Sequence, residues 1–244
     1  MRTILMLCLF GVVLCSSNLA QAVNWQVIYS EDFSSDPGWS TNAPSNYEWD
    51  QANEQYDIRN IKGTDQSAYI PITYSPDKSY KLTFDILSTR CDWAGYSFFG
   101  FWDADMSIYS PTQWFASYHY VDAGKTASLI YWDTQGGYYH PGQAQPIPYS
   151  LGTLYHNEAV YDRTAGTLSL TVTDATGTYP PQTLTGVGTF SGIERLGFSN
   201  MGDYYAVGST WEGYIDNVVV YETPEPATLF LLTLGGLAVL RKKK

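Results

Sequence analysis

The sequence contains very little cysteine. Of the three cysteines, Cys8 and Cys15 fall in the apolar segment that opens the chain, and Cys91 has no partner in the remainder. A disulfide framework is therefore excluded, so stability must come from packing. We expect Cys91 to be a small buried side chain.

Positive charge is also scarce. The 244 residues include 13 Lys and Arg against 24 Asp and Glu, a formal net charge of −11. Proteins that follow the phosphates of a nucleic acid need a basic face, so this class is excluded. His119, His140 and His156 lack the spacing of metal ligands, and the chain has no glycine-rich phosphate loop.

A helical hydrophobic period is missing between residues 23 and 223, where short alternating segments recur instead. Residues 80–86 place Tyr80, Leu82, Phe84 and Ile86 on one face and polar side chains on the other. Turn signals such as Asp36-Pro37-Gly38 separate the segments. Further predicted strands lie at residues 25–33, 54–59, 96–102, 113–121, 127–132, 155–161, 167–172, 195–199 and 211–221.

This pattern predicts an all-β fold, an antiparallel β-sandwich of the jelly-roll kind. The segment 23–223 is long enough for one such domain, and no internal repeat points to a propeller or a solenoid. It contains 8 Lys and Arg and 23 Asp and Glu, a net charge of −15. Such an acidic surface favours divalent cations.

The first residues have the features of a secretory signal peptide. Met1-Arg2 gives a positive start, residues 4–15 are apolar, and Ala20-Gln21-Ala22 is a cleavage triplet. We therefore expect residues 1–22 to be removed and the mature chain to begin at Val23.

The other terminus has three features in a fixed order. Pro224, Glu225 and Pro226 precede fourteen uncharged residues, 227–240, and the chain closes with Arg241, Lys242, Lys243 and Lys244. As a helix the apolar run spans roughly 21 Å, less than a hydrocarbon core of about 30 Å, and a run of this length is typical of a core helix. The terminal cations favour a membrane anchor, because they snorkel to the interface and resist translocation.

Residues 224–244 resemble the PEP-CTERM sorting tail, with Gly235-Gly236 inside the apolar run. The resemblance implies a Gram-negative bacterium and export across its inner membrane. It further implies a transmembrane helix that anchors the chain and an exosortase that cleaves near Pro224, Glu225 and Pro226. The processed domain then reaches the cell surface or the extracellular matrix.

The domain at 23–223 is similar to concanavalin A-like, laminin-G-type sandwiches. The resemblance rests on a strand, turn and strand at residues 155–168, on the opening residues 30–33 and on the ending 213–220. Galactose-binding-like jelly rolls share this ending and remain the alternative. In the resembling domains the first and last strands are often neighbours, and an acidic pair from them holds structural calcium. Glu31 or Asp32 with Asp216 fits this role, whereas hydrogen bonding of Asp216 to backbone amides is the alternative.

Aromatic residues are abundant between positions 93 and 139. Aromatic rings stack on the apolar face of a sugar, although sandwich cores also contain many of them. Tyr138 and Tyr139 follow Gly136-Gly137, so we expect loop residues there. The candidate glycan-binding residues are Trp114, Trp132, Tyr138 and Tyr139.

A hydrolytic alternative rests on Glu48, Asp50 and Glu54. Their spacing is similar to the catalytic strand of laminarinase-type glucanases, in which carboxylates alternate on one strand face. The residues between them are polar or small where that strand is normally apolar, which favours a solvated edge strand.

The sequence therefore predicts an exported, non-enzymatic protein of the cell surface or biofilm matrix that binds an exopolysaccharide. Two alternatives stay open. One is a glycoside hydrolase or polysaccharide lyase on the same fold, and the other is a structural envelope protein without a small ligand.

Overall fold

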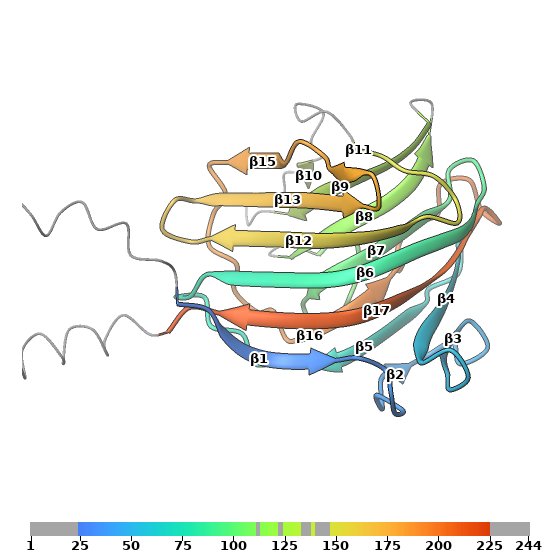
Figure 1. The fold of residues 1–244 in the computed structure, drawn as a ribbon, viewed down its shortest axis with the longest axis horizontal. Coiled ribbons are helices and arrows are strands. Elements are labelled where there is room, and N and C mark those ends of the chain that lie inside the picture. Colours follow the sequence, from blue (N-terminus) through green and yellow to red (C-terminus); the bar gives the residue numbers. More distant parts are fainter. Residues whose placement is uncertain (1–23, 111–112, 122–123, 133–137, 140–146, 225–244) are drawn as a thin grey trace, which may run out of the picture.

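The chain forms two antiparallel sheets packed face to face (Figure 1). The structure is a computed structural model that describes residues 24–110, 113–121, 124–132, 138–139 and 147–224. All regular structure in these ranges is β-strand, which confirms the predicted all-β sandwich. Within them no helix is long and apolar enough to cross a bilayer. The predicted signal peptide and the apolar run at 227–240 lie outside the described residues.

Sheet A faces the viewer in Figure 1, and sheet B lies behind it. The strands of sheet A are β1 (Gln26–Glu31), β3 (Tyr47–Asp50), β4 (Gln55–Ile61), β6 (Tyr80–Cys91), β12 (Leu154–Asp162), β13 (Thr167–Asp174), β14 (Gly177–Thr178), β15 (Gln182–Thr185) and β17 (Thr210–Glu222). Those of sheet B are β2 (Ser40–Thr41), β5 (Ser67–Pro71), β7 (Tyr96–Trp102), β8 (Trp114–Val121), β9 (Gly124–Trp132), β10 (Tyr138–Tyr139), β11 (Ile147–Pro148) and β16 (Arg195–Ser199).

Strand order brings together segments that are far apart in the chain. Sheet A has the order β14-β13-β12-β6-β17-β4-β3, and sheet B has the order β10-β9-β8-β7-β16-β5-β2. In addition, β1 pairs with β17, β15 with β13, and β11 with β9. Each predicted strand segment overlaps a strand of the structure.

The main core lies between the two sheets. On β6 the predicted inward set of Tyr80, Leu82, Phe84 and Ile86 is buried. The Phe84 ring of sheet A meets the Phe99 ring of sheet B with centroids 4.9 Å apart. Aromatic pairs of this geometry stabilise the core beyond their buried area.

Sheet B is covered on both faces. Its outer face carries a second buried cluster, formed by Phe98, Trp102, Met106, Ile108, Phe115 and Ile130. Met106 and Ile108 belong to the loop after β7, which therefore lies across the outside of the sheet. The Ile108 amide donates to the Met201 carbonyl at 2.9 Å, so this loop reaches the segment after β16.

The first and last strands are neighbours, as the fold resemblance implies. β1 pairs with the second half of β17 and β4 with its first half. The ladder is interrupted after Asp216, where Asn217 has φ +52°. Because of this bulge Val218 and Val220 are buried, whereas Asp216 is on the outer face.

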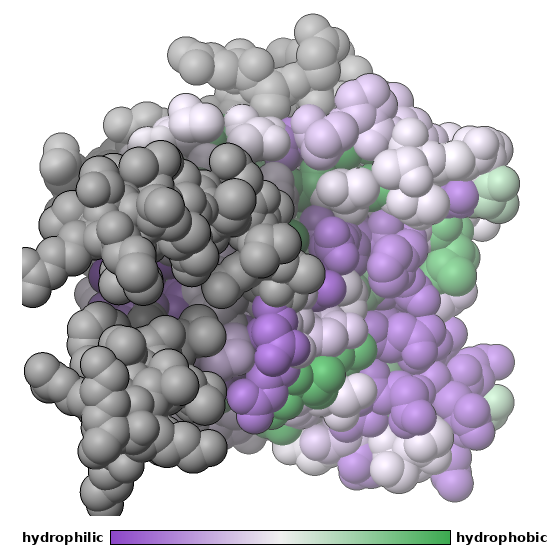
Figure 2. Space-filling view, turned by 60° about the vertical axis from the view of Figure 1, so that its left-hand side comes forward, coloured by the Kyte–Doolittle hydropathy of each residue, from purple (hydrophilic) through white to green (hydrophobic). Residues whose placement is uncertain are grey.

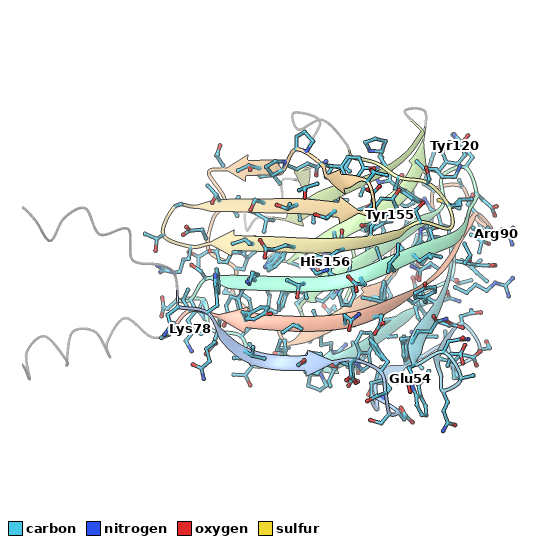
Figure 3. The ribbon with its side chains drawn as sticks, viewed as in Figure 1. Glu54, Lys78, Arg90, Tyr120, Tyr155 and His156 are labelled. Carbon is cyan, nitrogen blue, oxygen red and sulfur yellow. The ribbon has the colours of Figure 1, made fainter. Side chains whose placement is uncertain are left out.

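Both ends of the described chain leave the sandwich on the left of Figure 1. β17 begins at Thr210 at the opposite end and finishes at Glu222 beside the start of β6, since Glu222 pairs with Tyr80. A strand of 13 residues is about 40 Å long. The sandwich therefore has a proximal end, which continues into the sorting segment, and a distal end. Figure 3 marks the proximal end by Lys78 and the distal end by Arg90.

Candidate functional site

Exposed aromatic side chains gather at the distal end. Among the described residues, the large exposed hydrophobic side chains include four aromatic ones, and all four are held on loops that meet there. With Val207 they form what we call the aromatic patch, whose side chains are between 48% and 69% exposed. The aromatic patch consists of Trp93, Tyr109, Tyr204, Tyr205 and Val207.

Backbone hydrogen bonds fix the loop that carries three of these residues. In this segment, 200–209, the Gly208 amide donates to the Lys62 carbonyl at 2.9 Å. The Lys62 amide donates to the Ser209 carbonyl at 3.0 Å, and the Gly63 amide donates to the Asp203 carbonyl at 3.1 Å. Gly63 has φ +82°, and a Cβ there would lie 2.5 Å from a Val207 methyl group. The close approach of the two loops therefore requires glycine at this position.

A buried ammonium group lies beneath the aromatic patch. Lys62 is only 1% exposed, and its Nζ atom lies 2.9 Å from Oδ2 of Asp203. The same atom lies 4.0 Å from the ring centroid of Tyr96 and 5.1 Å from that of Tyr205. Burial lowers the pKa of Lys62, and the Asp203 carboxylate opposes this shift. The ammonium group thus holds a carboxylate and two rings in fixed positions.

Specific contacts hold three rings of the aromatic patch in place, those of Trp93, Tyr204 and Tyr205. Trp93 and Tyr205 lie with their centroids 6.0 Å apart and their planes at 57°. The Tyr204 hydroxyl donates to the Asp65 carboxylate, with oxygen distances of 2.9 and 3.0 Å, and this hydrogen bond raises the pKa of Tyr204. Such rings can stack on the C–H face of a pyranose, while a nearby carboxylate accepts hydrogen bonds from its hydroxyl groups.

Tyr109 comes from the loop that lies across sheet B. A Cβ on Gly202 would lie 3.1 Å from Cδ2 of Tyr109, so the ring rests directly on the glycine backbone. Gly202 has φ +86°, and its amide donates to Asp65 at 3.0 Å. This contact joins the outer cover of sheet B to the distal loops.

The predicted glycan-binding residues have different positions. Trp114 is fully buried in the main core, where its ring packs 4.5 Å from Phe101. Its prediction as a glycan contact is not supported, because no part of the ring reaches the surface. Tyr138 lies in β10 and pairs with Trp132, and Tyr139 pairs with Tyr131. These two tyrosines therefore form a short strand and not a loop. The structure describes the backbone of Trp132, Tyr138 and Tyr139 but not their side chains.

The predicted calcium residues use their carboxylates locally. Glu31 accepts the Phe33 amide at 2.8 Å, Asp32 accepts the Ser34 amide at 3.1 Å, and Asp216 accepts the Asn217 amide at 2.7 Å. In the part of the chain that is described, no group of three His, Cys, Asp or Glu side chains is arranged to hold a metal ion. Calcium at these residues therefore stays a prediction, and a calcium ion would have to replace their hydrogen bonds to the amides.

Asp216 lies opposite Asp85 of β6 instead. The Asn217 amide group donates to Asp85 at 2.9 Å, and Nδ1 of His156 lies 2.7 Å from the other Asp85 oxygen. Burial raises the pKa of Asp216, and the charge of Asp85 adds to this shift. Figure 3 shows His156 in the middle of sheet A, away from Arg90 at the distal end.

The predicted carboxylate strand is divided by a turn. Glu48 and Asp50 lie on β3, but Glu54 lies in the turn before β4 with φ +51°. Asp50 accepts the Ala52 amide at 2.9 Å and the Asn53 side chain at 2.6 Å. The three carboxylates of the hydrolytic alternative therefore do not share one strand, because Asp50 ends β3 by capping this turn. β3 is the last strand in the order of sheet A, as the favoured interpretation of an edge strand predicts.

A groove of about 430 Å³ lies on the outer face of sheet A near this hairpin. Its lining includes Glu48, Asp57 and Glu212 together with Arg59 and Tyr214. Burial raises the pKa of Asp57, and the charges of Asp50 and Glu48 add to this. Arg59 pairs with Glu212 at 3.2 Å. Figure 2 shows that hydrophilic side chains predominate on the described part of the surface in that view.

Two further predictions can be compared with the structure. Cys91 is a free, buried cysteine, as expected, and burial raises the pKa of its thiol. His119 is buried, with its ring nitrogens 3.1 Å from the Ser117 hydroxyl and 2.9 Å from the Thr126 hydroxyl. His140 lies outside the described residues.

Sequence reasoning missed Tyr109, Tyr204 and Tyr205 as site residues. One available signal was the run Gly202-Asp203-Tyr204-Tyr205, which repeats the glycine-before-paired-tyrosine pattern at 136–139. No sequence signal shows that the loops of residues 93, 109 and 204 meet, because their meeting depends on the three-dimensional path of each loop.

Residues 222–244 match the PEP-CTERM protein-sorting motif. No curated protein sequence matches the chain. A lectin from Bauhinia forficata, solved in complex with GalNAc, shares 14% identity, with 82% of this chain and 98% of that chain covered and a TM-score of 0.55. The carbohydrate recognition domain of Emp47p shares 13% identity over 84% of this chain and 100% of that chain, with a TM-score of 0.53.

A sialidase shares 16% identity over 79% of this chain and 18% of that chain, with a TM-score of 0.50. At these identities the likenesses concern the fold. The chain thus carries a PEP-CTERM sorting motif at residues 222–244, behind an all-β sandwich of the lectin-like, concanavalin A-like fold.

Proposed function

We propose that this protein is an exported, non-enzymatic surface or matrix protein that binds polysaccharide through the aromatic patch. The observation that carries the proposal is the gathering of four exposed aromatic side chains on loops at the distal end. Large exposed apolar groups on one small area mark interaction sites, and rings between carboxylates suit sugars.

The position of the sorting motif supports this orientation. The motif begins at Glu222, the last residue of β17, whereas the aromatic patch lies where β17 begins. A PEP-CTERM motif implies export and processing by an exosortase at the membrane. A chain held there by an anchor at its C-terminal end would present the aromatic patch about 40 Å away from the bilayer. We assign the processed protein to the surface or matrix of a Gram-negative bacterium.

The proposal is tested by glycan-array binding of the full chain in mild detergent. Trp93→Ala and Tyr205→Ala each remove one ring of the closest pair, so we expect each to weaken binding about tenfold. Leu154→Ala is the matched control, because Leu154 is also exposed but lies on β12. Equal glycan binding by the wild type and these three variants would show that the aromatic patch is not the binding site.

The groove on sheet A favours a second candidate, a glycoside hydrolase or polysaccharide lyase. Glu48 and Asp57 lie directly opposite each other on β3 and β4. The raised pKa of Asp57 is a property of general acids. Release of reducing ends or unsaturated products, abolished by Asp57→Asn, would support this candidate. A structural envelope protein, the third possibility, would neither bind nor cleave.

A further inference from the structure

The basic side chains of the domain are already engaged. All eight Lys and Arg between residues 23 and 223 are described, and six of them form ion pairs with carboxylates. The pairs are Arg59–Glu212, Lys62–Asp203, Lys78–Glu222, Lys81–Glu158, Arg90–Asp92 and Arg163–Asp77. Arg90 also reaches Glu212 at 3.3 Å.

The other two basic side chains lie over tyrosine rings. Arg195 is 4.2 Å from the ring centroid of Tyr69, and Lys125 is 4.5 Å from that of Tyr120. The Tyr120 carbonyl accepts the Ala94 amide at 2.6 Å, next to Trp93. Of the two basic residues without a carboxylate partner among the described residues, Lys125 thus contacts a residue that is hydrogen-bonded to the loop of Trp93. The test below therefore includes a Lys125 variant.

The surroundings of the aromatic patch are acidic. Asp65 accepts hydrogen bonds from Tyr204 and from the Gly202 amide, so its charge lies among the rings. Asp92 precedes Trp93, and its pKa is lowered by hydrogen bonds from Arg90. The domain as a whole carries −15. This field repels a polyanion over distances up to about 10 Å at moderate salt.

Recognition of acidic sugars requires a different set of groups. A uronate carboxylate or a sulfate is normally held by Arg or Lys, whose charge offsets its loss of hydration. Here the one ammonium group beneath the aromatic patch, that of Lys62, is 1% exposed and paired with Asp203. A neutral pyranose needs only a ring face and hydroxyl partners, and the aromatic patch provides both.

We infer that the polysaccharide recognised by the aromatic patch carries no negative charge and is a neutral or amino-bearing glycan. This inference rests on the proposed function and specifies the ligand class of the same site. Polyuronates and sulfated chains are excluded as direct ligands.

The test compares three soluble probes against the full chain by titration at low ionic strength: laminarin as a neutral glucan, chitosan oligosaccharides and alginate oligosaccharides of matched length. We expect alginate to bind at least about tenfold more weakly than the better of the other two. Asp65→Asn keeps the hydrogen-bond acceptor of Tyr204 but removes the charge. It is expected to weaken chitosan binding several-fold and to change laminarin binding less than about twofold.

The outcomes separate the inference from the proposed function. Alginate binding without added calcium that equals or exceeds the other two, and that is lost in Trp93→Ala or Lys125→Ala, would overturn the inference while retaining the site. Binding of laminarin or chitosan that is unchanged in Trp93→Ala and Tyr205→Ala would overturn the site itself. Alginate binding that appears only with calcium and disappears on chelation would show a bridging metal and would also overturn the exclusion of acidic glycans.

Discussion

The Lys62 ammonium lies 2.9 Å from the Asp203 carboxylate, with 1% of the lysine side chain and 8% of the aspartate side chain exposed. The pair joins the loop after β4 to the loop after β16. It also places a cation against the Tyr205 ring. The aromatic patch therefore rests on a buried ion pair, and its geometry depends on both partners.

Breaking this pair should destabilise the domain. Asp203→Asn leaves a buried ammonium group without its counter-charge, so we expect a loss of about 3 kcal/mol in the free energy of unfolding. Addition of Lys62→Met to this variant should restore part of the loss. Urea unfolding measures both effects. Arg163→Ala breaks an exposed pair and serves as the control, with a loss below about 1 kcal/mol. Equal losses in Asp203→Asn and Arg163→Ala would contradict the role of the buried pair.

Gly213 permits the close packing of β17 against β6. A Cβ at this position would overlap the Leu87 carbonyl oxygen. Gly213→Ala is therefore expected to cost about 3 kcal/mol. Gly188→Ala is the matched control, because a Cβ there would meet no atom within 4 Å, and its effect should stay within about 0.5 kcal/mol. Thermal unfolding of the two variants gives the comparison, and similar melting temperatures would show that the strands do not approach as described.

Asp216 should make stability depend on pH. Its pKa is raised from the ordinary value of 3.8, by burial and by the charges of Asp85, Asp32 and Glu54. Because the folded pKa exceeds the unfolded one, the folded protein binds this proton more tightly. Stability from this group is then present in acid and is lost as the pH rises through the folded pKa.

Asp216→Asn should consequently raise the melting temperature by roughly 1–3 °C at pH 7. The gain should disappear below about pH 3, where the wild-type carboxyl group is protonated in both states. Melting curves of the two proteins across this range provide the check. A variant that is less stable than the wild type at pH 7 would contradict the destabilising role of the Asp216 charge.

Calcium gives a separate test of the same residues. Glu31, Asp32 and Asp216 bind their own neighbouring amides, and a calcium site would have to replace these hydrogen bonds. We expect that a chelator leaves the melting temperature unchanged and that added calcium has the same effect on the wild type as on Asp216→Asn. A rise confined to the wild type would instead support the metal site that the fold resemblance implies.

A substitution in the sorting segment should block processing of the chain. Glu225 lies in the centre of the Pro-Glu-Pro signature, within the matched residues 222–244. In Glu225→Ala we expect the unprocessed chain to accumulate in the membrane fraction, as detected by immunoblot of fractionated cells. Normal surface display by this variant, or by a chain lacking residues 224–244, would contradict sorting through the tail.

Sequence reasoning succeeded where periodicity decides the structure. The alternation in residues 80–86 identified the inward face of β6, because one face of sheet A is solvated. It failed for Trp114, because β7 and β8 are buried on both faces, so alternation of hydrophobicity no longer distinguishes core from surface. The strands β2, β5, β10, β11, β14 and β15 were also missed. Four of them, β2, β10, β11 and β14, have only two residues and therefore no period.

The aromatic patch could not be derived from the sequence for a topological reason. Trp93, Tyr109 and Tyr205 come from three loops that meet only after the β7–β8 loop has crossed sheet B. The burial of Lys62 could not be predicted from the sequence either, because its partner Asp203 is 141 positions away in the chain. Long-range contacts of this kind are set by strand order and not by local pattern.

The most direct test of the central claim is affinity electrophoresis of the full chain in gels that contain the matrix polysaccharide of the producing bacterium. The wild type and the Leu154→Ala control are expected to be retarded relative to a gel without polysaccharide. The double variant Trp93→Ala/Tyr205→Ala is expected to migrate as it does in the empty gel while keeping its melting temperature within a few degrees of the wild type. Equal retardation of the wild type and the folded double variant would contradict glycan recognition by the aromatic patch.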